Sequence, residues 1–482
     1  MSEFFAYNPE EPLIFSSGLF LLLFTAFLVI YTALRDDERP RLIFVTLFSL
    51  YFYYKSSGVF FFLLINATVI DFFLAQAIYS TGDRFRKKLL LAASLTANLG
   101  VLGYFKYTNF LFGTITGLTG GEYQPMDIFL PVGISFFTFQ SLSYTIDVYR
   151  GYLKPVKSIL DYAFYLSFFP QLVAGPIVRA ADFLPQIRRR VDITEEMLGN
   201  GVFLIATGLF KKAVISDYIS INFVDRIFDA PALYTGLENL FAVYGYALQI
   251  YCDFSGYSDM AIGIALLLGF HFAPNFNSPY QSVNITEFWR RWHISLSTWL
   301  RDYLYISLGG NRKGKLRTYI NLMITMLLGG LWHGAAWRFV IWGGLHGIAL
   351  VVHKRWSETI GPRFTGRVSR IAGLFLTFHF VCFCWIYFRA ADIENVNVML
   401  RQIVLNFHLD VLFQFISGYK WVVLLMIIGF VLHFIPENIT DKVRTRIIRM
   451  SLPMKAVCIV AVIVLVIQTR SAEVQPFIYF QF

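Results

Sequence analysis

Charged residues are scarce in this sequence. Asp, Glu, Lys and Arg make up only 15% of the 482 residues, whereas soluble globular proteins carry about 25%. Hydrophobic residues reach 56% and aromatic residues 18%. So little charge beside so much apolar surface argues against a soluble or disordered chain. The composition predicts an all-α protein that crosses a membrane many times.

Cysteine is also rare, and its placement excludes two common uses. Cys252, Cys382, Cys384 and Cys458 all lie inside apolar segments, which argues against a disulfide framework and against a structural zinc site. The first residues, MSEFFAYNPEEP, lack a basic region, so no removable signal peptide is expected. No internal repeat, low-complexity stretch or soluble domain is visible, and residues 1–482 are predicted to form a single membrane domain.

The net charge of +10 follows the topology of a membrane protein rather than nucleic-acid binding, because Lys and Arg fall in short clusters between apolar runs. The apolar runs, at about 17 to 25 residues per span, predict about twelve transmembrane helices. They lie near 13–34, 42–54, 59–80, 89–112, 128–147, 199–227, 240–270, 318–333, 335–352, 371–388, 419–435 and 453–468.

The basic clusters are expected on the cytoplasmic side. Segments with few basic residues, including 1–12, 113–127, 389–418 and the tail SAEVQPFIYFQF, are expected outside. Lys106, Lys211 and Lys212 lie within apolar runs. Such lysines either extend towards an interface or line a cavity, and the sequence leaves both readings open.

Two segments are predicted not to cross the membrane. Residues 159–185 contain Pro170 and Pro176 inside an apolar run with basic clusters on both sides, which favours a re-entrant segment. Residues 287–308, EFWRRWHISLSTWLRDYLYISL, repeat apolar residues with helical spacing but carry too much charge to span. They predict one interfacial helix, with His293 on its apolar face.

The run LGGLWHGAAWRFVIWGGLHG, residues 328–347, places His333 in an apolar setting. A polar group in hydrocarbon needs a partner or a watery cavity, so His333 is either bonded to a neighbouring helix or part of a site. The neighbouring Gly330 and Gly334 are expected to leave room for a ligand or another backbone.

Acid–base chemistry is the use that best fits isolated neutral imidazoles. Metal binding by His293, His333 and His346 is disfavoured, because no carboxylate or cysteine stands at ligand spacing nearby. His293 and His333 are therefore the candidate catalytic residues, and no metal and no bound cofactor are expected.

Five stretches carry a resemblance to a known family. They are SFFTFQSLSYTIDVYRG (135–151), FFPQLVAGPI (168–177), YCDFSGYSDMAIG (251–263), NITEFWRRWHISLSTWLRDYLYISLGGNR (284–312) and LLGGLWHGAAWRFVIWGGLHG (327–347). Together, and in this order, they resemble the membrane-bound O-acyltransferases, in particular the bacterial alginate O-acetylation proteins and related polysaccharide O-acetyltransferases.

The resemblance implies a ring of helices around a central cavity, with His333 at the family's signature histidine position and His293 at a second polar position. It implies transfer of an acetyl group from a cytoplasmic thioester, such as acetyl-CoA, to an extracytoplasmic polysaccharide. It also implies a bacterial inner membrane, contact with lipid and an extracytoplasmic SGNH-type acetyltransferase partner, with no role for nucleic acid.

Two other classes stay open at this point. A transporter would also contain broken helices and buried polar groups, although it would be expected to show repeats. A non-catalytic scaffold that presents polysaccharide to a partner is the other, and it predicts that histidine substitutions leave thioester consumption unchanged.

Overall fold

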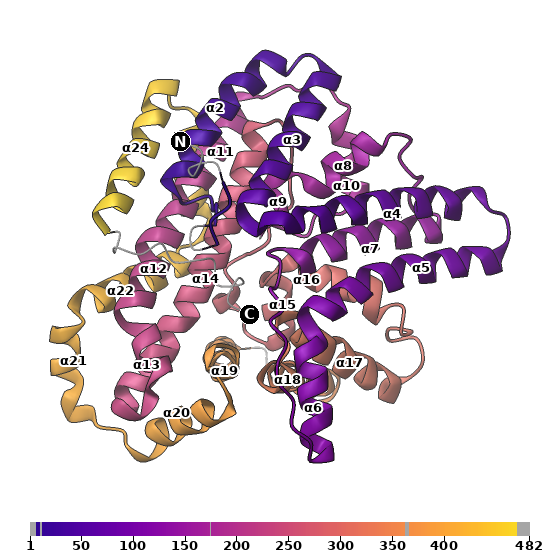
Figure 1. The fold of residues 1–482 in the computed structure, drawn as a ribbon. Helices are drawn as coiled ribbons and strands as arrows, with labels where there is room; N and C mark the ends of the chain where they lie inside the picture. The colour runs from indigo at the N-terminus through magenta and orange to yellow at the C-terminus, as the bar shows by residue number, and fades with distance from the viewer. Residues whose placement is uncertain (1–5, 10–11, 174, 362–365, 470–482) are drawn as a thin grey trace. The chain divides into compact units, whose positions relative to one another are not determined.

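The fold is known from a computed structural model that describes residues 6–9, 12–173, 175–361 and 366–469. These residues form α-helices joined by short 3₁₀ and π turns, with no β-strand in the described ranges. The chain divides into two compact units, Met1–Gly201 with Met260–Ala273 and Val202–Asp259 with Pro274–Phe482 (Figure 1). The predicted all-α class is confirmed. The tail SAEVQPFIYFQF lies outside the described residues.

In the first unit, α4, α5 and α7 pack against one another (Figure 1). Its helices are α2 (Gly18–Leu34), α3 (Glu38–Ser57), α4 (Phe61–Ser80), α5 (Arg84–Leu102), α6 (Thr108–Thr119), α7 (Ile134–Arg150), α8 (Ile159–Ser167), α9 (Phe169–Leu172) and α10 (Ala180–Ile187). Between the three packed helices Asp71 is buried and accepts hydrogen bonds from Ser94 and Asn98. These donors satisfy a carboxylate that has no basic partner in the cluster.

The segment 159–185 is broken, as its prolines predict. α8 ends at Ser167, α9 is a single turn that carries Pro170 near its start, and α10 begins at Ala180. Tyr165 in α8 donates a hydrogen bond to the carbonyl of Val178, beyond the break. Side chains therefore satisfy backbone groups that a continuous helix would have paired, as non-helical backbone at membrane depth requires.

The second unit holds the candidate site. Its helices, of which α11 begins and α14 ends in the first unit, are α11 (Glu195–Leu209), α12 (Asp217–Ile219), α13 (Asp225–Asp229), α14 (Gly236–Leu267), α15 (Ile285–Arg291), α16 (Ile294–Trp299), α17 (Lys315–His333), α18 (Trp337–Thr359), α19 (Arg367–Arg389), α20 (Ile393–Leu405), α21 (Leu412–Gly418), α22 (Lys420–Phe434), α23 (Glu437–Ile448) and α24 (Leu452–Thr469). α18 packs against α15, α17 and α19. α17 carries His333, α18 carries His346, and His293 lies between α15 and α16.

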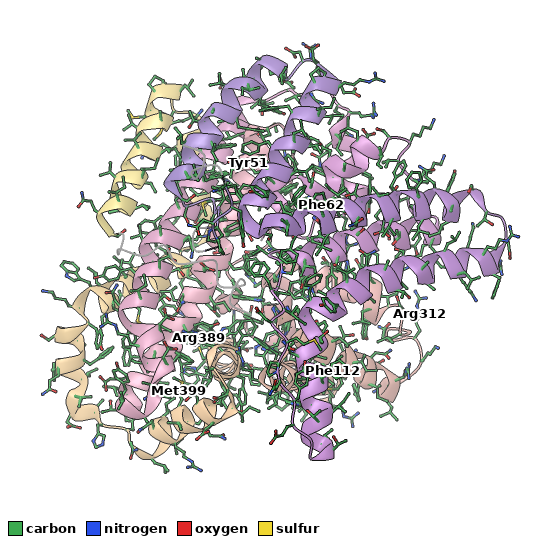
Figure 2. All side chains as sticks on the ribbon, in the orientation of Figure 1. Tyr51, Phe62, Phe112, Arg312, Arg389 and Met399 are labelled. Carbon is green, nitrogen blue, oxygen red and sulfur yellow. The ribbon has the colours of Figure 1, made fainter. Side chains whose placement is uncertain are left out.

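Several helices are long and apolar enough to cross a membrane. In the described ranges five qualify, or up to seven if α20 with α21 and α22 with α23 each count as one bent span. Large apolar side chains also point outwards: Phe62 is 56% exposed and Phe112 49% exposed (Figure 2). Apolar side chains on an outer surface are suited to lipid. The chain is a polytopic helical membrane protein, and the larger number of twelve spans stays a prediction.

The two adjacent lysines of the second unit are paired with carboxylates. Lys212 is 2% exposed, and its Nζ lies 2.7 Å from Asp217 and 2.6 Å from Asp253. Lys211 Nζ lies 2.7 Å from Asp259. A buried cation needs such partners to offset its loss of hydration. Lys212 therefore does not extend to an interface, which was one of the two readings of the sequence.

Candidate active site

Glycines bring α17 and α18 unusually close together. A Cβ on Gly330 would lie 2.2 Å from the carbonyl oxygen of Phe339, and one on Gly343 would lie 2.3 Å from that of Met326. Both obstacles are backbone atoms, so neither position accepts a larger residue without a shift of the helices. α17 ends at His333 and α18 begins at Trp337, close to the boundaries predicted for these two helices.

His333 lies at the end of α17 among aromatic rings. Its side chain is 3% exposed, and its ring centroid is 5.0 Å from those of Trp332 and Trp342 and 5.1 Å from that of Phe388. The predicted apolar setting is confirmed. The room expected beside Gly334 is filled, because a Cβ there would lie 2.0 Å from the ring of Phe339. Access to His333 is therefore not through Gly334.

His293 marks a break that the sequence does not predict. The expected single helix over 287–308 is wrong: α15 ends at Arg291, His293 has φ +43°, and α16 begins at Ile294. Positive φ is uncommon outside glycine. The break is held by a distant residue, since the carbonyl of Asn275 accepts from the backbone of Ile294 and its side-chain oxygen accepts from Ser295.

The His293 side chain is fully buried, as its position on the apolar face predicts. Its Nδ1 lies 3.3 Å from the Asn275 side-chain oxygen, and its ring packs 4.6 Å from Phe254. Burial lowers the pKa of His293 to about 3, so the ring is neutral near pH 7. His293 also packs 6.0 Å from Trp332, the residue beside His333. Trp332 thus contacts the rings of both candidate catalytic histidines.

A third histidine, His346 on α18, joins the same group of aromatic rings. It is fully buried, and its Nδ1 accepts a hydrogen bond from Trp289 Nε1 at 3.3 Å. Its ring centroid is 4.7 Å from that of Trp342, which also contacts His333. Sequence reasoning considered His346 only as a metal ligand. The sequence did contain a signal for this pair: Trp342 and His346 are spaced one helical turn apart, so they lie on the same face of α18.

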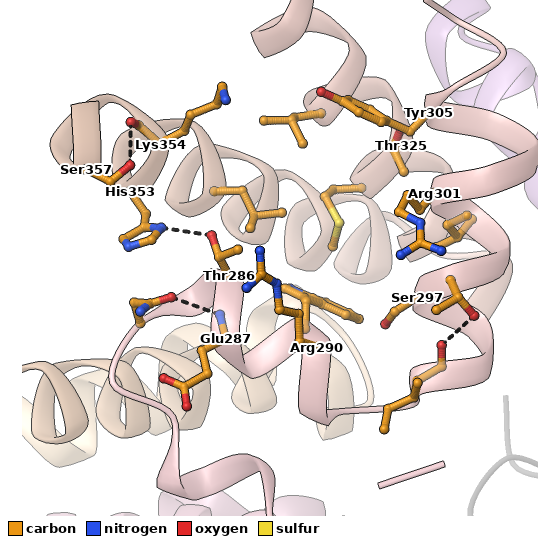
Figure 3. Close-up of a pocket in the computed structure, with 18 residues that line it drawn as sticks. Thr286, Glu287, Arg290, Ser297, Arg301, Tyr305, Thr325, His353, Lys354 and Ser357 are labelled. Atoms are coloured by element: carbon orange, nitrogen blue, oxygen red, sulfur yellow. Dashed lines mark hydrogen bonds between the residues drawn. The ribbon is translucent and has the colours of Figure 1, made fainter. Parts of the chain in front are cut away.

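A cavity of about 860 Å³ lies against these helices. Residues from α15, α16, α17 and α18 line it, and Arg290 and Arg301 both point into it (Figure 3). Thr286 and His353 bond across one wall, with 2.8 Å between the hydroxyl and Nδ1. Trp289 is both a lining residue and the hydrogen-bond donor to His346. Trp289 therefore links the wall of the cavity to the buried His346.

The arrangement combines buried imidazoles with an adjoining cavity that carries positive charge. Such a site can hold an anionic substrate and move a proton in surroundings that exclude water. Among the described residues no three His, Cys, Asp or Glu side chains are placed to hold a metal ion. The chemistry available to these residues is acid–base chemistry.

Comparison with known proteins agrees with this chemistry. Residues 86–394, more than half of the chain, match the family described as MBOAT, membrane-bound O-acyltransferase family. A peptidoglycan O-acetyltransferase of Helicobacter pylori is 37% identical over 423 residues, which cover 81% of this chain and 80% of the relative. The probable alginate O-acetylase AlgI of Pseudomonas aeruginosa is 41% identical over 396 residues, covering 81% and 74%.

A more distant relative is a teichoic acid D-alanyltransferase of Bacillus subtilis, 29% identical over 276 residues that cover 54% of this chain and 69% of the relative. The family match includes His293, His333 and His346 and the helices around them. The chain belongs to the membrane-bound O-acyltransferase family and is an O-acyltransferase.

Proposed function

We propose that the chain, acting as one unit over residues 1–482, transfers an acetyl group from a cytoplasmic thioester to a hydroxyl of an extracytoplasmic polysaccharide. The family match runs through residues of both compact units, which supports one functional unit. Relatives that modify alginate and peptidoglycan support a polysaccharide acceptor. Their bacterial origin supports an inner-membrane location.

The donor site is the cavity beside α15. Arg301 pairs with Asp302 at 2.6 Å and Lys354 with Glu358 at 3.5 Å, whereas Arg290 has no ion-pair partner among the described residues. An unpaired guanidinium is suited to a phosphate group. Acetyl-CoA carries phosphates at the end remote from its thioester, so it is the donor that fits the cavity, and it acts as substrate rather than as a bound cofactor.

The cavity lies on the side predicted to face the cytoplasm. Lys315, within the basic segment 312–317, forms an ion pair with Glu358 of α18 at 3.1 Å. Glu358 follows Ser357, which lines the cavity. The basic loop is expected in the cytoplasm, where acetyl thioesters are made. This ion pair and the expected cytoplasmic loop support a cytoplasmic donor.

The observation that carries the proposal is the connection from this cavity to His333. Trp289 lines the cavity and is bonded to His346, His346 packs against Trp342, and Trp342 packs against His333. This series of contacts links the donor cavity to the imidazole that acts on the acceptor. The reacting groups are then brought together in a water-poor site.

His333 acts as the general base. It takes the proton of the acceptor hydroxyl as the hydroxyl oxygen attacks the thioester carbon, and a tetrahedral intermediate forms. When the carbon–sulfur bond breaks, His333 gives the proton to the departing thiolate, so the step is balanced. His293 orients the acceptor or polarises the thioester carbonyl. We also propose an SGNH-type acetyltransferase as the partner: where it takes part, the hydroxyl that attacks the thioester is its own, and it then passes the acetyl group to the polysaccharide. Membrane lipid surrounds the helices.

The test is a transfer assay with purified protein, acetyl-CoA and a soluble polysaccharide acceptor. His333→Ala should lower turnover by about 10² to 10⁴ while donor binding persists, because a base acts mainly in the transition state. His293→Ala should reduce transfer only partly. His379→Ala is the control, since His379 bonds Tyr244 and the Phe375 carbonyl. Normal thioester consumption by His333→Ala would instead support a transporter or scaffold.

A further inference from the structure

Two buried N–H groups beside His333 have no acceptor. Trp342 is 1% exposed and His346 is fully buried. Neither Trp342 Nε1 nor His346 Nε2 has a hydrogen-bond partner among the described residues. Buried polar groups are nearly always paired, and an unmet donor costs about 1 to 3 kcal/mol. Two such donors on adjacent turns of one helix call for an acceptor that belongs to a ligand.

The proton on His346 is located by its neighbour. Trp289 Nε1 can only donate, and it points at His346 Nδ1 at 3.3 Å. His346 Nδ1 must therefore accept with its lone pair, which leaves the proton of the neutral ring on Nε2. A neutral imidazole held in this tautomer can donate to a carbonyl oxygen, as a neutral histidine does in triosephosphate isomerase.

Both donors lie where the reaction is expected. The Trp342 ring is 5.0 Å from His333, and the His346 ring is 4.7 Å from Trp342. His346 is also bonded to Trp289, a wall of the donor cavity. The contacts from the cavity wall to His333 run through Trp289, His346 and Trp342, so a thioester that reached His333 along them would meet these two side chains. Its carbonyl oxygen is the acceptor that they lack.

We propose that His346 Nε2–H and Trp342 Nε1–H form the oxyanion site of the acyl transfer, an inference that rests on the proposed function. The carbonyl oxygen of the acetyl thioester accepts from both groups. As the acceptor oxygen adds to the carbon, the carbonyl electron pair moves to this oxygen, and the two donors stabilise its negative charge. The charge returns to the carbonyl when the carbon–sulfur bond breaks. This arrangement leaves His293 to orient the acceptor.

Steady-state kinetics with acetyl-CoA and a soluble acceptor test the proposal. His346→Leu removes the donor but keeps an apolar side chain, and kcat should fall about 10² to 10³, the usual loss for one oxyanion donor, with KM for acetyl-CoA nearly unchanged. His346→Gln keeps an N–H donor and should recover much of kcat. Trp342→Phe keeps an aromatic ring and should lower kcat likewise. A purely structural role predicts neither the rescue by Gln nor the unchanged KM.

A second readout does not depend on turnover. The infrared carbonyl band of acetyl-CoA bound to His333→Ala should lie at lower frequency than in solution, and His346→Leu added to this variant should abolish the shift. If His346→Leu misfolds, His346→Gln and Trp342→Phe carry the test. Equal carbonyl frequencies together with normal kcat in the His346 and Trp342 variants would overturn the oxyanion site alone. Normal turnover by His333→Ala would overturn the proposed function itself.

Discussion

The side-chain oxygen of Asn275 accepts hydrogen bonds from the backbone N–H of Ser295 at 3.1 Å and from its hydroxyl at 2.9 Å. Ser295 stands two residues after the positive-φ residue His293. Asn275 precedes α15 in the chain and is itself buried. It therefore fixes, from outside α15 and α16, the break that orients His293.

Replacement of Asn275 by leucine should destabilise the protein and lower transfer. The substitution removes the acceptor shared by the N–H and the hydroxyl of the half-buried Ser295, and a lost hydrogen bond costs about 0.5 to 1.5 kcal/mol. Thermal unfolding in detergent measures the loss. Ser258→Ala is the matched control because it removes only the donation of the Asn275 amide to Ser258 at 3.2 Å and keeps the acceptor oxygen of Asn275. Equal losses in both variants would show that the acceptor is not what matters.

The buried His293 should make stability depend on pH. The pKa of His293 is lowered to about 3 in the folded state, against about 6.5 in an unfolded chain. Between these values the unfolded state binds the extra proton, so stability is present above pH 6.5 and is lost as pH falls. The slope for one such group is about 1.4 kcal/mol per pH unit.

His293→Asn removes the titrating group, and asparagine tolerates the left-handed backbone. The change in midpoint temperature from pH 6.5 to pH 4.5 should therefore be smaller for His293→Asn than for the wild type. His379→Asn, far from this break in the chain, controls for loss of a histidine as such. An unchanged pH dependence in His293→Asn would mean that the ring is protonated in the folded protein.

The close approach of α17 and α18 can be tested at Gly343, and the adjacent Gly344 supplies the control. A Cβ on Gly343 would lie 2.3 Å from the Met326 carbonyl oxygen, whereas one on Gly344 would meet only the Leu327 side chain at 3.7 Å. Gly343→Ala should destabilise the protein and reduce transfer, because it pushes apart the two helices that hold His333. Gly344→Ala should be neutral or add up to about 1 kcal/mol, the usual gain over glycine within a helix. The thermal unfolding midpoints of the two variants test this prediction. Equal midpoints would contradict the tight contact at Gly343.

The α17–α18 pair was predictable from sequence, whereas the break at His293 was not. Apolar runs and glycines next to one another encode α17 and α18 locally, so their boundaries near His333 follow from a short window. The helical spacing of 287–308 is the same with or without a break, and the break depends on Asn275, outside that window. Local patterns cannot report such a tertiary contact.

In the candidate site, too, local features were predictable from the sequence and contacts between distant residues were not. His333 was found because an imidazole in an apolar run is conspicuous by itself, and His293 because helical spacing places it on the apolar face of 287–308. The partnership of His346 with Trp289 was not found, since the two residues are 57 positions apart and lie on different helices. The pairing of Lys212 with Asp217 and Asp253 was open for a similar reason, because Asp253 belongs to α14. Each missed feature joins separate elements.

Arg290 should determine how well the enzyme uses a donor that carries phosphate. Arg290→Gln removes the unpaired guanidinium from the cavity. A hydrogen bond to a charged group contributes about 1.5 to 3 kcal/mol, so KM for acetyl-CoA should rise about tenfold to a hundredfold. The value of kcat should change little, because the contact is made equally in the ground and transition states.

The comparison of two donors isolates this contact from general damage to the site. Acetylpantetheine carries the same thioester as acetyl-CoA but no phosphate, so its kcat/KM should be the same for wild type and Arg290→Gln. Arg355→Gln is the control substitution, since Arg355 is exposed on α18 and does not line the cavity. It should leave both donors unaffected. If Arg290→Gln weakened acetylpantetheine as much as acetyl-CoA, Arg290 would act on the fold or the reacting end, and the phosphate end of the donor would have to bind elsewhere.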